Sequence, residues 1–470
     1  MIDSSSFDVI IIGAGPGGYV GAIRAAQLGL RVALIEAEEL GGVCLNWGCI
    51  PTKALLKTAE MYRHIHEATE FGLNVTSMKV DWKKVIARSR HVSNQLTRGI
   101  AGLMKKNTIT VVKGWGSILG KDAANFMVRV THGNDERLLE AAHVIVATGA
   151  TAKALPHVQP NHTHIWTARD AMTADKRPDS LLVIGSGAIG IEFASFYNTF
   201  GTKVTVIEIQ DRILPVEDRE VSAFMEKSLA KQGISLLTNT TVSALKPKGN
   251  LVEVVLKDAS GNEASHQFDR VLSAVGIAGN VANIGLEKTK AVVEKSQIIT
   301  DSYMETAEPG VYAIGDVTGG PWLAHKASHE AVIAIEHIAK QKTHALDKSC
   351  IPSCTYSYPQ VASVGISEAE AVARGLSIKV GKFPFIGNGK ALASGEIEGF
   401  IKTIFDAQSG ELLGAHMIGD GVTELIHGFV LAKSGELTEA EIMKTVYPHP
   451  TMSEMIHESV LQAFDRPLHI

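Results

Sequence analysis

The stretch Phe7-Asp-Val-Ile-Ile-Ile-Gly13-Ala-Gly15-Pro-Gly-Gly18 decides how the chain folds. Its apolar run predicts a buried strand, and its spaced glycines predict a tight turn into a helix of small residues. Gly13 allows the turn, Gly15 lets a pyrophosphate approach the helix N-terminus, and Gly18 lets helix and strand pack closely. The next apolar run ends at Glu36, whose carboxylate can accept a hydrogen bond from a ribose hydroxyl. The stretch therefore predicts a dinucleotide-binding unit.

The same unit occurs again 172 residues further along the chain. The apolar run Leu181–Ile184 is followed by glycines and an acid at the matching positions, which are Gly185, Gly187, Gly190 and Glu208. Glycines that served unrelated turns would not share one offset together with a paired acid, so the sequence predicts two dinucleotide-binding domains. Glu208 would repel a 2′-phosphate and accept from a free 2′-hydroxyl, which favours NAD over NADP in the second domain.

Two of the four cysteines, Cys44 and Cys49, lie five residues apart in the glycine-flanked stretch 41–53. Side chains at this spacing on a regular helix diverge by about 140°, so a bond between them needs a loosened turn, which Gly48 can supply. A strained, accessible disulfide is typical of a working redox couple. The alternatives are two unrelated buried thiols or half of a zinc site. Zinc needs about four ligands and the two cysteines would supply only half of them, so the pattern favours redox chemistry.

Length and composition limit the number of domains and the kinds of partner that the chain can have. A chain of 470 residues, of which 45% are hydrophobic, is long enough for several domains. The net charge of −5 offers no basic field for nucleic acid or an anionic membrane. The apolar runs have the length of strands, and no leader precedes the first glycine turn, so we expect a cytoplasmic protein without a membrane span. The low cysteine count fits a reducing compartment.

The order of the motifs predicts four segments. Residues 1–150 contain the first dinucleotide unit, 151–277 the second, 278–348 a central segment, and 349–470 a region of short strands followed by helices. The last region is typical of a separate α+β domain. The predicted fold class is α/β, with two doubly wound, Rossmann-like dinucleotide-binding domains and a C-terminal α+β domain.

The C-terminal tail places a histidine between two prolines. A helix capped by Thr451 or Ser453 would bring Glu454 into its first turn, within reach of the His449 imidazole. A carboxylate that orients a histidine and stabilises its charged form makes a good general base. The alternative is a capping turn with a surface histidine.

Two further features are less specific. Asp316 follows an apolar strand, at the edge where ligands lie in a doubly wound sheet, although a solvated turn aspartate is the alternative. Cys350 and Cys354 flank Pro352, which indicates small inert hydrophobes rather than a second redox pair.

Taken together, these motifs resemble the two-cysteine flavoprotein disulfide reductases over essentially the whole chain. The motifs are the paired dinucleotide units, the stretch from Cys44 to Lys53, Ala147-Thr-Gly149, Ile314-Gly-Asp316 and His449-Pro-Thr-Met-Ser-Glu454. The resemblance implies FAD in the first unit, with contacts from Gly13, Gly15, Gly18, Glu36, Gly116, Asp316 and Ala324. It implies NAD in the second unit, with contacts from Gly185, Gly187, Gly190, Glu208 and Gly276.

The resemblance also implies roles for individual side chains. Cys49 would face the flavin as the charge-transfer thiol, and Cys44 would exchange with a lipoyl disulfide. His449, held by Glu454, would be the base and would reach the cysteines of the other subunit of a homodimer. Lys53 would lie beside the flavin and pair with Glu192. The central segment would complete the FAD site, and the last domain would form the subunit interface.

The implied reaction is FAD-dependent oxidation of protein-bound dihydrolipoamide to lipoamide, with reduction of NAD and no metal. The implied partners are the lipoyl domains and the binding domain of a 2-oxoacid dehydrogenase acyltransferase, or the lipoyl carrier of glycine cleavage. Within the family, Glu208 opposes a glutathione reductase, and a tail without cysteines opposes a mercuric reductase. A non-catalytic redox-sensing scaffold dimer is the remaining alternative, and the intact set Cys44, Cys49, His449 and Glu454 disfavours it.

Overall fold

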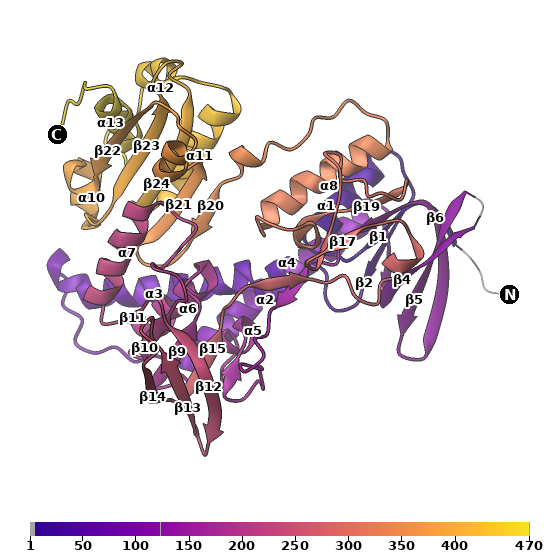
Figure 1. Ribbon diagram of the computed structural model, residues 1–470, viewed down its shortest axis with the longest axis horizontal. Coiled ribbons are helices and arrows are strands. Elements are labelled where there is room, and N and C mark those ends of the chain that lie inside the picture. The colour runs from indigo at the N-terminus through magenta and orange to yellow at the C-terminus, as the bar shows by residue number, and fades with distance from the viewer. Residues whose placement is uncertain (1–4, 123, 470) are drawn as a thin grey trace. The chain divides into compact units, whose positions relative to one another are not determined.

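The computed structural model describes residues 5–122 and 124–469 (Figure 1). Its contacts divide the chain into two compact units, each assembled from separate segments. Unit 1 combines Met1–Ala54, Lys83–Lys153 and Gly276–Leu346, and unit 2 combines Leu55–Trp82, Ala154–Val275 and Asp347–Ile470. The four segments that the sequence predicts, ending at 150, 277, 348 and 470, are a finer division and stay a prediction.

Unit 1 is built on a mixed sheet with the strand order β3-β2-β1-β6-β5-β4, in which β19 also pairs with β6. The pairs formed by β1, β2, β3, β6 and β19 are parallel, and β5 and β4 add an antiparallel extension. The strands are β1 (Ser5–Ile12), β2 (Val32–Glu36), β3 (Thr110–Lys113), β4 (Trp115–Asp122), β5 (Asn125–His132), β6 (Asp135–Val146) and β19 (Val311–Ala313). Two short antiparallel pairs accompany them, β7 (Ala150–Ala152) with β16 (Ile277–Gly279), and β17 (Val293–Glu294) with β18 (Gln297–Ile298).

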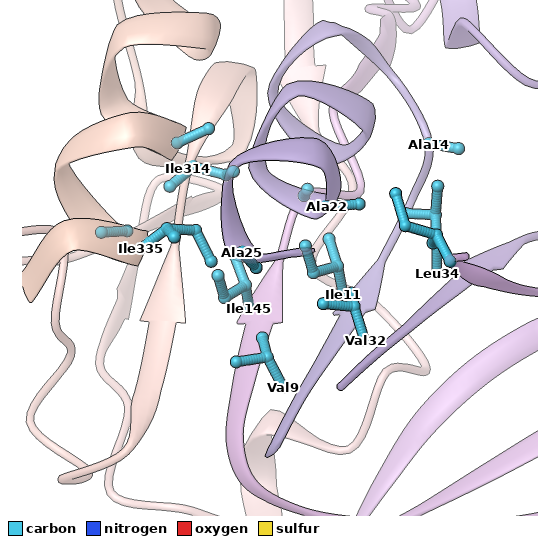
Figure 2. Close-up of a cluster of buried hydrophobic side chains, with 14 of the residues drawn as sticks. Val9, Ile11, Ala14, Ala22, Ala25, Val32, Leu34, Ile145, Ile314 and Ile335 are labelled. Carbon is cyan, nitrogen blue, oxygen red and sulfur yellow. The ribbon is translucent and has the colours of Figure 1, made fainter. Parts of the chain in front are cut away.

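Helices cover this sheet, and the first and last of them do so with small residues. They are α1 (Pro16–Gln27), α2 (Gly42–Trp47), the first residues of α3 (Cys49–Glu67), α4 (Trp82–Lys106) and α8 (Ala324–Ile338). Figure 2 shows Ala25 of α1 beside Ile145 of β6 and Ile335 of α8 in one buried cluster. The central run Val9–Ile12 of β1 and strand β2 are apolar residue after residue, because apolar segments cover both of their faces. The fold thereby brings residues 324–338 onto the first helix.

Unit 2 repeats the parallel arrangement with the strand order β11-β10-β9-β15-β8. Its strands are β8 (Ile165–Trp166), β9 (Ser180–Ile184), β10 (Lys203–Ile207), β11 (Ser235–Leu237) and β15 (Arg270–Ser273). An antiparallel meander packs on the sheet through an apolar cluster and consists of β12 (Thr241–Lys248), β13 (Leu251–Lys257) and β14 (Glu263–Phe268). The helices here are α5 (Ala168–Ala171), α6 (Ala188–Thr199) and α7 (Arg219–Lys231).

The C-terminal part of unit 2 is an antiparallel sheet with the order β20-β21-β24-β23-β22. Its strands are β20 (Ser353–Thr355), β21 (Gln360–Gly365), β22 (Ile378–Pro384), β23 (Phe400–Asp406) and β24 (Leu412–Gly419). The helices α9 (Glu368–Ala373), α10 (Gly389–Ser394), α11 (Val422–Ser434), α12 (Glu439–Lys444) and α13 (Glu454–Ala463) complete it. Helix α13 begins at Glu454 with Ser453 at its N-cap position, as the sequence predicted, but the Ser453 side chain makes no capping hydrogen bond. Within the described residues, no helix combines the length and the apolar character needed to cross a membrane.

Candidate active site

The first glycine turn lies between β1 and α1 and leaves space in front of the helix. A Cβ on Gly18 would lie 1.8 Å from the Gly13 carbonyl oxygen, so only glycine fits where the helix crosses the turn. A Cβ on Gly15, the N-cap residue of α1, would meet nothing within 4 Å. No side chain caps this helix, so its first N–H groups stay open to a ligand. An anionic pyrophosphate fits this position because the helix dipole and the free N–H groups both favour it.

Glu36, at the end of β2, is fixed by backbone donors. Its Oε2 accepts from the Ala14 N–H at 2.7 Å, and its Oε1 accepts from the Glu38 N–H at 2.7 Å. The carboxylate is thus held beside the glycine turn with lone pairs to spare. A ribose hydroxyl could donate to them.

The second glycine turn repeats this geometry between β9 and α6. A Cβ on Gly190 would lie 2.0 Å from the Gly185 carbonyl oxygen, and one on Gly187 would meet nothing within 4 Å. Glu208 follows β10 and is only 7% exposed. Its Oε2 accepts from the Ser186 N–H at 2.9 Å and from the Ser186 hydroxyl at 2.7 Å, while Oε1 accepts from the Gln210 N–H at 3.0 Å. The second acid is more buried and more heavily bonded than the first.

The cysteine loop breaks between its two cysteines. Helix α2 ends at Trp47, Gly48 has φ −146° and ψ −115°, and α3 starts afresh at Cys49. A Cβ on Gly48 would lie 3.0 Å from the Val43 carbonyl oxygen and 3.3 Å from the Cys44 Cα, so this break depends on a residue without a side chain. The turn brings the two sulfurs together although their spacing on a continuous helix would separate them.

Cys44 and Cys49 are thiols in contact with each other. A side-chain hydrogen bond with Cys49, and then burial, raise the pKa of the Cys44 thiol, whereas the positive charge of Lys53 lowers it. Lys53 lies one helical turn beyond Cys49 on α3. The neighbouring sulfur and burial therefore outweigh the lysine charge at this thiol.

The cysteine loop is attached directly to the first glycine turn. The Gly41 N–H donates to the Ala14 carbonyl at 2.9 Å, and a Cβ on Gly42 would lie 2.7 Å from the Gly15 Cα. Behind the loop, the buried Asn46 side chain donates to the Leu40 and Gly42 carbonyls at 3.0 Å each. The thiol pair and the turn that would hold a dinucleotide therefore form one structural piece within unit 1.

The remaining predicted contacts of the first unit lie on three elements of unit 1. Asp316 lies in the 3₁₀ turn Gly315–Thr318 after β19, and burial raises the pKa of its carboxyl. Ala324 is the first residue of α8. Gly116 lies in β4, where a Cβ would be 3.1 Å from the Ile12 side chain at the end of β1. Gly116 thus has a packing reason to be glycine whether or not a ligand lies near it.

The predicted partners of the second unit lie on α6 and after β15. Glu192 of α6 is buried, and its Oε1 accepts from the Tyr356 N–H at 2.9 Å. Gly276 has φ +111°, and a Cβ there would meet nothing within 4 Å. Lys53 belongs to unit 1 and Glu192 to unit 2, so the pairing of these two residues stays a prediction.

The C-terminal pair is formed as a local motif of unit 2. The His449 Nδ1 lies 2.9 Å from the Glu454 Oε1, and the Thr451 N–H donates to Oε2 at 2.9 Å. The Thr451 N–H, followed by the His449 side chain, lowers the pKa of Glu454, and the imidazole is 79% exposed. An imidazole held through Nδ1 presents Nε2 to a reaction partner. The approach of His449 to the cysteines stays a prediction.

Among the described residues, no group of three or more His, Cys, Asp or Glu side chains could hold a metal ion. Cys350 donates to the Asp347 Oδ2 at 3.1 Å, and burial raises the pKa of this thiol. The sequence reasoning missed the buried pair Lys326 and Glu330 of α8, which bonds to the turn around Asp316. No local signal marks this pair, because a lysine and a glutamate four residues apart have the spacing of a solvent-exposed pair on a helix.

Comparisons with known proteins agree with this geometry. Residues 7–331 match the family described as pyridine nucleotide-disulphide oxidoreductase, and residues 351–460 match the dimerisation domain of that family. The chain belongs to the pyridine nucleotide-disulphide oxidoreductase family, as the sequence predicted, and it is a flavoprotein oxidoreductase that uses FAD and NAD. The dimerisation domain supports a homodimer.

Three relatives named dihydrolipoyl dehydrogenase align with nearly the whole chain. The protein of Zymomonas mobilis is 50% identical over 464 residues, which cover 98% of this chain and 99% of that one. That of Rhizobium etli is 48% identical over 478 residues, covering 99% of each chain. That of Bacillus subtilis is 43% identical over 474 residues, covering 99% of this chain and 100% of the relative.

Solved structures show the same fold. LpdA of Mycobacterium tuberculosis superimposes with a TM-score of 0.91 at 26% identity, covering 97% of this chain and 99% of the other. A Cu(II) complex of the HOCl-induced flavoprotein disulfide reductase RclA of Escherichia coli gives a TM-score of 0.86 at 26% identity, with the same coverage. The predicted α/β fold class with a C-terminal dimerisation domain is confirmed.

Proposed function

We propose that this chain is a dihydrolipoyl dehydrogenase, which oxidises protein-bound dihydrolipoamide to lipoamide and reduces NAD⁺ to NADH. The observation that carries the proposal is the contact of the Cys44 and Cys49 thiols on a loop fastened to the first glycine turn. This contact gives a sulfur couple next to a dinucleotide site. Relatives that are up to 50% identical over nearly the full length bear the name of this activity.

The residues predicted for the cofactors fit a dinucleotide in each unit. Uncapped helix N-termini behind Gly15 and Gly187 would hold the pyrophosphates, and Glu36 and Glu208 would accept from ribose hydroxyls. Asp316, Ala324 and Gly116 would complete the FAD site, and Gly276 the NAD site. FAD held in the first unit would supply the two-electron chemistry that links a dithiol to a nicotinamide.

The sulfur chemistry proceeds through residues of this chain. His449, oriented by Glu454, removes a proton from one dihydrolipoamide thiol, and the thiolate attacks Cys44 in the Cys44–Cys49 disulfide. The new lipoyl–Cys44 bond forms as Cys49 leaves as a thiolate. The second lipoyl thiol then displaces Cys44, which gives oxidised lipoamide and an enzyme dithiol. Lys53, whose charge favours the Cys44 thiolate, would stabilise the negative charge at this step and pair with Glu192.

The segment boundaries gain a functional meaning in this proposal. Residues 1–150 would bind FAD, 151–277 NAD, 278–348 would complete the FAD site, and 349–470 would form the dimer interface. Unit 1 supports the third assignment because it joins Gly276–Leu346 to the segment with the first glycine turn. His449 would serve the cysteines of the partner subunit. The further partners would be the lipoyl domains and the binding domain of a 2-oxoacid dehydrogenase acyltransferase, or the lipoyl carrier of glycine cleavage. The protein would be located in the cytoplasm.

A substrate comparison tests the proposal. The purified, yellow protein should reduce NAD⁺ with dihydrolipoamide and should not reduce glutathione disulfide or mercuric ion with NADPH. NADPH-dependent reduction of either compound would replace the proposal with the corresponding reductase. Absence of turnover with all three, in a protein that retains flavin, would favour a redox-sensing scaffold.

Two experiments test the roles of the side chains. Partial reduction should give a long-wavelength thiolate-to-flavin band that disappears in Cys49→Ser, and a surviving band would remove Cys49 from this role. Mixing inactive His449→Gln and Cys44→Ser subunits should restore part of the activity if each site uses both subunits. No recovery in a mixture shown to contain heterodimers would contradict the shared site.

A further inference from the structure

Two opposite charges are buried together in α8, directly beneath the turn that contains Asp316. The Lys326 Nζ lies 2.9 Å from the Glu330 Oε1, and the two side chains are 1% and 2% exposed. A buried ion pair is a poor source of stability, because the cost of removing both charges from water roughly cancels their attraction. A well-packed apolar pair would serve the core of unit 1 at least as well. The position of the charges therefore needs another explanation.

The pair forms hydrogen bonds with both the N–H and the carbonyl group of Gly315. The Glu330 Oε2 accepts from the Gly315 N–H at 2.7 Å, and the Lys326 ammonium donates to the Gly315 carbonyl at 3.1 Å. The ammonium also donates to the Thr318 hydroxyl at 3.0 Å, and that hydroxyl donates to the Gly315 carbonyl at 2.8 Å. The peptide that leads into Asp316 is thereby fixed from both sides.

The same charges act on the Asp316 carboxyl. Burial raises the pKa of this group, the Lys326 charge lowers it, and the Glu330 charge raises it. Asp316 follows β19 at the carboxyl end of the parallel strands of unit 1, which is the edge where a doubly wound sheet binds its ligand. Lys326 therefore opposes the effect of burial on the only acidic side chain of the turn.

We propose that Lys326 and Glu330 are positioning residues for FAD, which fix the Gly315–Thr318 turn so that the Asp316 carboxylate accepts hydrogen bonds from sugar-alcohol or ribose hydroxyls of the cofactor. This inference rests on the proposed function only in taking FAD as the ligand of unit 1. The pair does not touch the reacting sulfurs. Its effect should therefore show in how tightly the flavin is held.

The test measures the rate at which FAD leaves the holoenzyme, followed by the rise in flavin fluorescence after dilution. Lys326→Met removes the charge, and Lys326→Met/Glu330→Gln removes the whole ion pair while keeping the side-chain volumes. Both variants should release FAD at least about tenfold faster than the wild type, the loss expected when a hydrogen bond to a charged group is misplaced. The double variant should unfold at a temperature close to that of the wild type, because neither member of the pair is left as an unpaired buried charge.

Lys402→Met is the matched control, since Lys402 is also 1% exposed and paired with Asp218, Glu220 and Glu368 in unit 2. This variant should lose thermal stability and release FAD at the wild-type rate. If release accelerates equally in Lys326→Met and Lys402→Met, it follows stability and the inference is wrong. Wild-type release from the double variant would also overturn it.

Two further readouts separate positioning from a general structural role. In an Asp316→Asn background, Lys326→Met should add little to the release rate, because both changes act through one carboxyl. Full additivity would contradict the inference. In Lys326→Met alone, release should accelerate on acidification from a higher pH than in the wild type, because the pKa of Asp316 rises when the lysine charge is lost. A protein that holds FAD but does not oxidise dihydrolipoamide would refute the proposed function and leave this inference standing.

Discussion

The two dinucleotide units share a backbone and differ in what surrounds it. At an offset of 172 residues, both have a helix glycine that lies against the first carbonyl of its turn, at Gly18 and Gly190. In both, an acid at or directly after the end of the second strand accepts from the residue after the first glycine, Ala14 or Ser186. The shared features are those that a bound dinucleotide would need. The clearest differences lie in the helices that follow the two turns and in how each acid is buried and bonded.

The helices show the difference most clearly. In α1, Gly17 and Gly21 allow close approach of α8, and a Cβ on Gly17 would lie 3.1 Å from the Ala327 carbonyl oxygen. The matching positions in α6 are Ile189 and Phe193, and α6 also has large aromatic residues in contact with Trp82, namely Phe196, Tyr197 and Phe200. Small residues on the first helix admit a later chain segment that brings Asp316 with it. Large residues on the second helix exclude such a segment, which explains how one motif builds two different sites.

The largest expected effect comes from filling the shared glycine position. Gly18→Ala should give protein without flavin, because its Cβ would lie 1.8 Å from a backbone oxygen and the turn would have to open. Gly190→Ala should keep the wild-type ratio of flavin to protein absorbance and raise the KM for NAD by at least about tenfold. Loss of flavin in both variants would show that the two units do not function separately.

The second effect concerns the loops that follow the two acids. The first loop continues into the cysteines, whereas the second ends at Glu217. Burial raises the pKa of the Glu217 carboxyl to about 7. Its Oε2 has no hydrogen-bond partner among the described residues. A carboxyl with a raised folded pKa is stabilising below its unfolded pKa, and this contribution is lost as pH rises from about 4.5 to about 7. The loss is of the order of 3 kcal/mol.

Glu217→Gln should remove this pH dependence from unit 2. Thermal unfolding at a series of pH values measures it, because wild-type stability should fall relative to the variant as pH rises through this interval. Glu220→Gln is a suitable control, since the pKa of Glu220 is lowered by its lysine partners and its removal should not reproduce the trend. Parallel curves for wild type and Glu217→Gln would mean that Glu217 is ionised in the folded protein.

The third effect tests whether Glu36 contributes only to FAD binding and Glu208 only to NAD binding. Glu208→Gln should raise the KM for NAD by about tenfold, that for NADP by less, and leave the flavin content unchanged, because only the ribose hydroxyl of NAD loses a charged acceptor. Glu36→Gln should instead accelerate the loss of FAD and leave the KM for NAD close to that of the wild type. Steady-state kinetics with both nucleotides and flavin content decide the matter, and equal losses with NAD and NADP would contradict the ribose contact.

These differences also show what the sequence could and could not predict. The glycine turns and acids were predictable because strand, turn and helix signals are local and recur at one offset. The contact of Cys44 with Cys49 could be predicted for the same reason, since both cysteines lie within one short segment that is broken by a glycine. The approach of α8 to α1 and the burial of Glu217 depend on segments far apart in sequence, so no local pattern indicates them.

The ion pair of α8 shows where pattern reading fails. Lys326 and Glu330 have the spacing of a surface pair on a helix, and such pairs usually lie in solvent. Only the tertiary fold reveals that this pair is buried and that it bonds to Gly315. The same holds for Glu192, whose backbone partner Tyr356 is more than 160 residues away.

The smallest expected effect comes from a substitution that makes the second glycine turn more like the first. Ser186→Ala introduces the residue found at the matching position, Ala14, and removes one of the hydrogen bonds to Glu208 while leaving the backbone N–H in place. A single neutral hydroxyl contributes about 1 kcal/mol, so the KM for NAD should rise about fivefold or less, with flavin content unchanged. The ratio of the KM values of variant and wild type measures this effect. If Ser186→Ala cost as much as Glu208→Gln, the hydroxyl and not the backbone would hold the carboxylate, and the two units would fix their acids by different means.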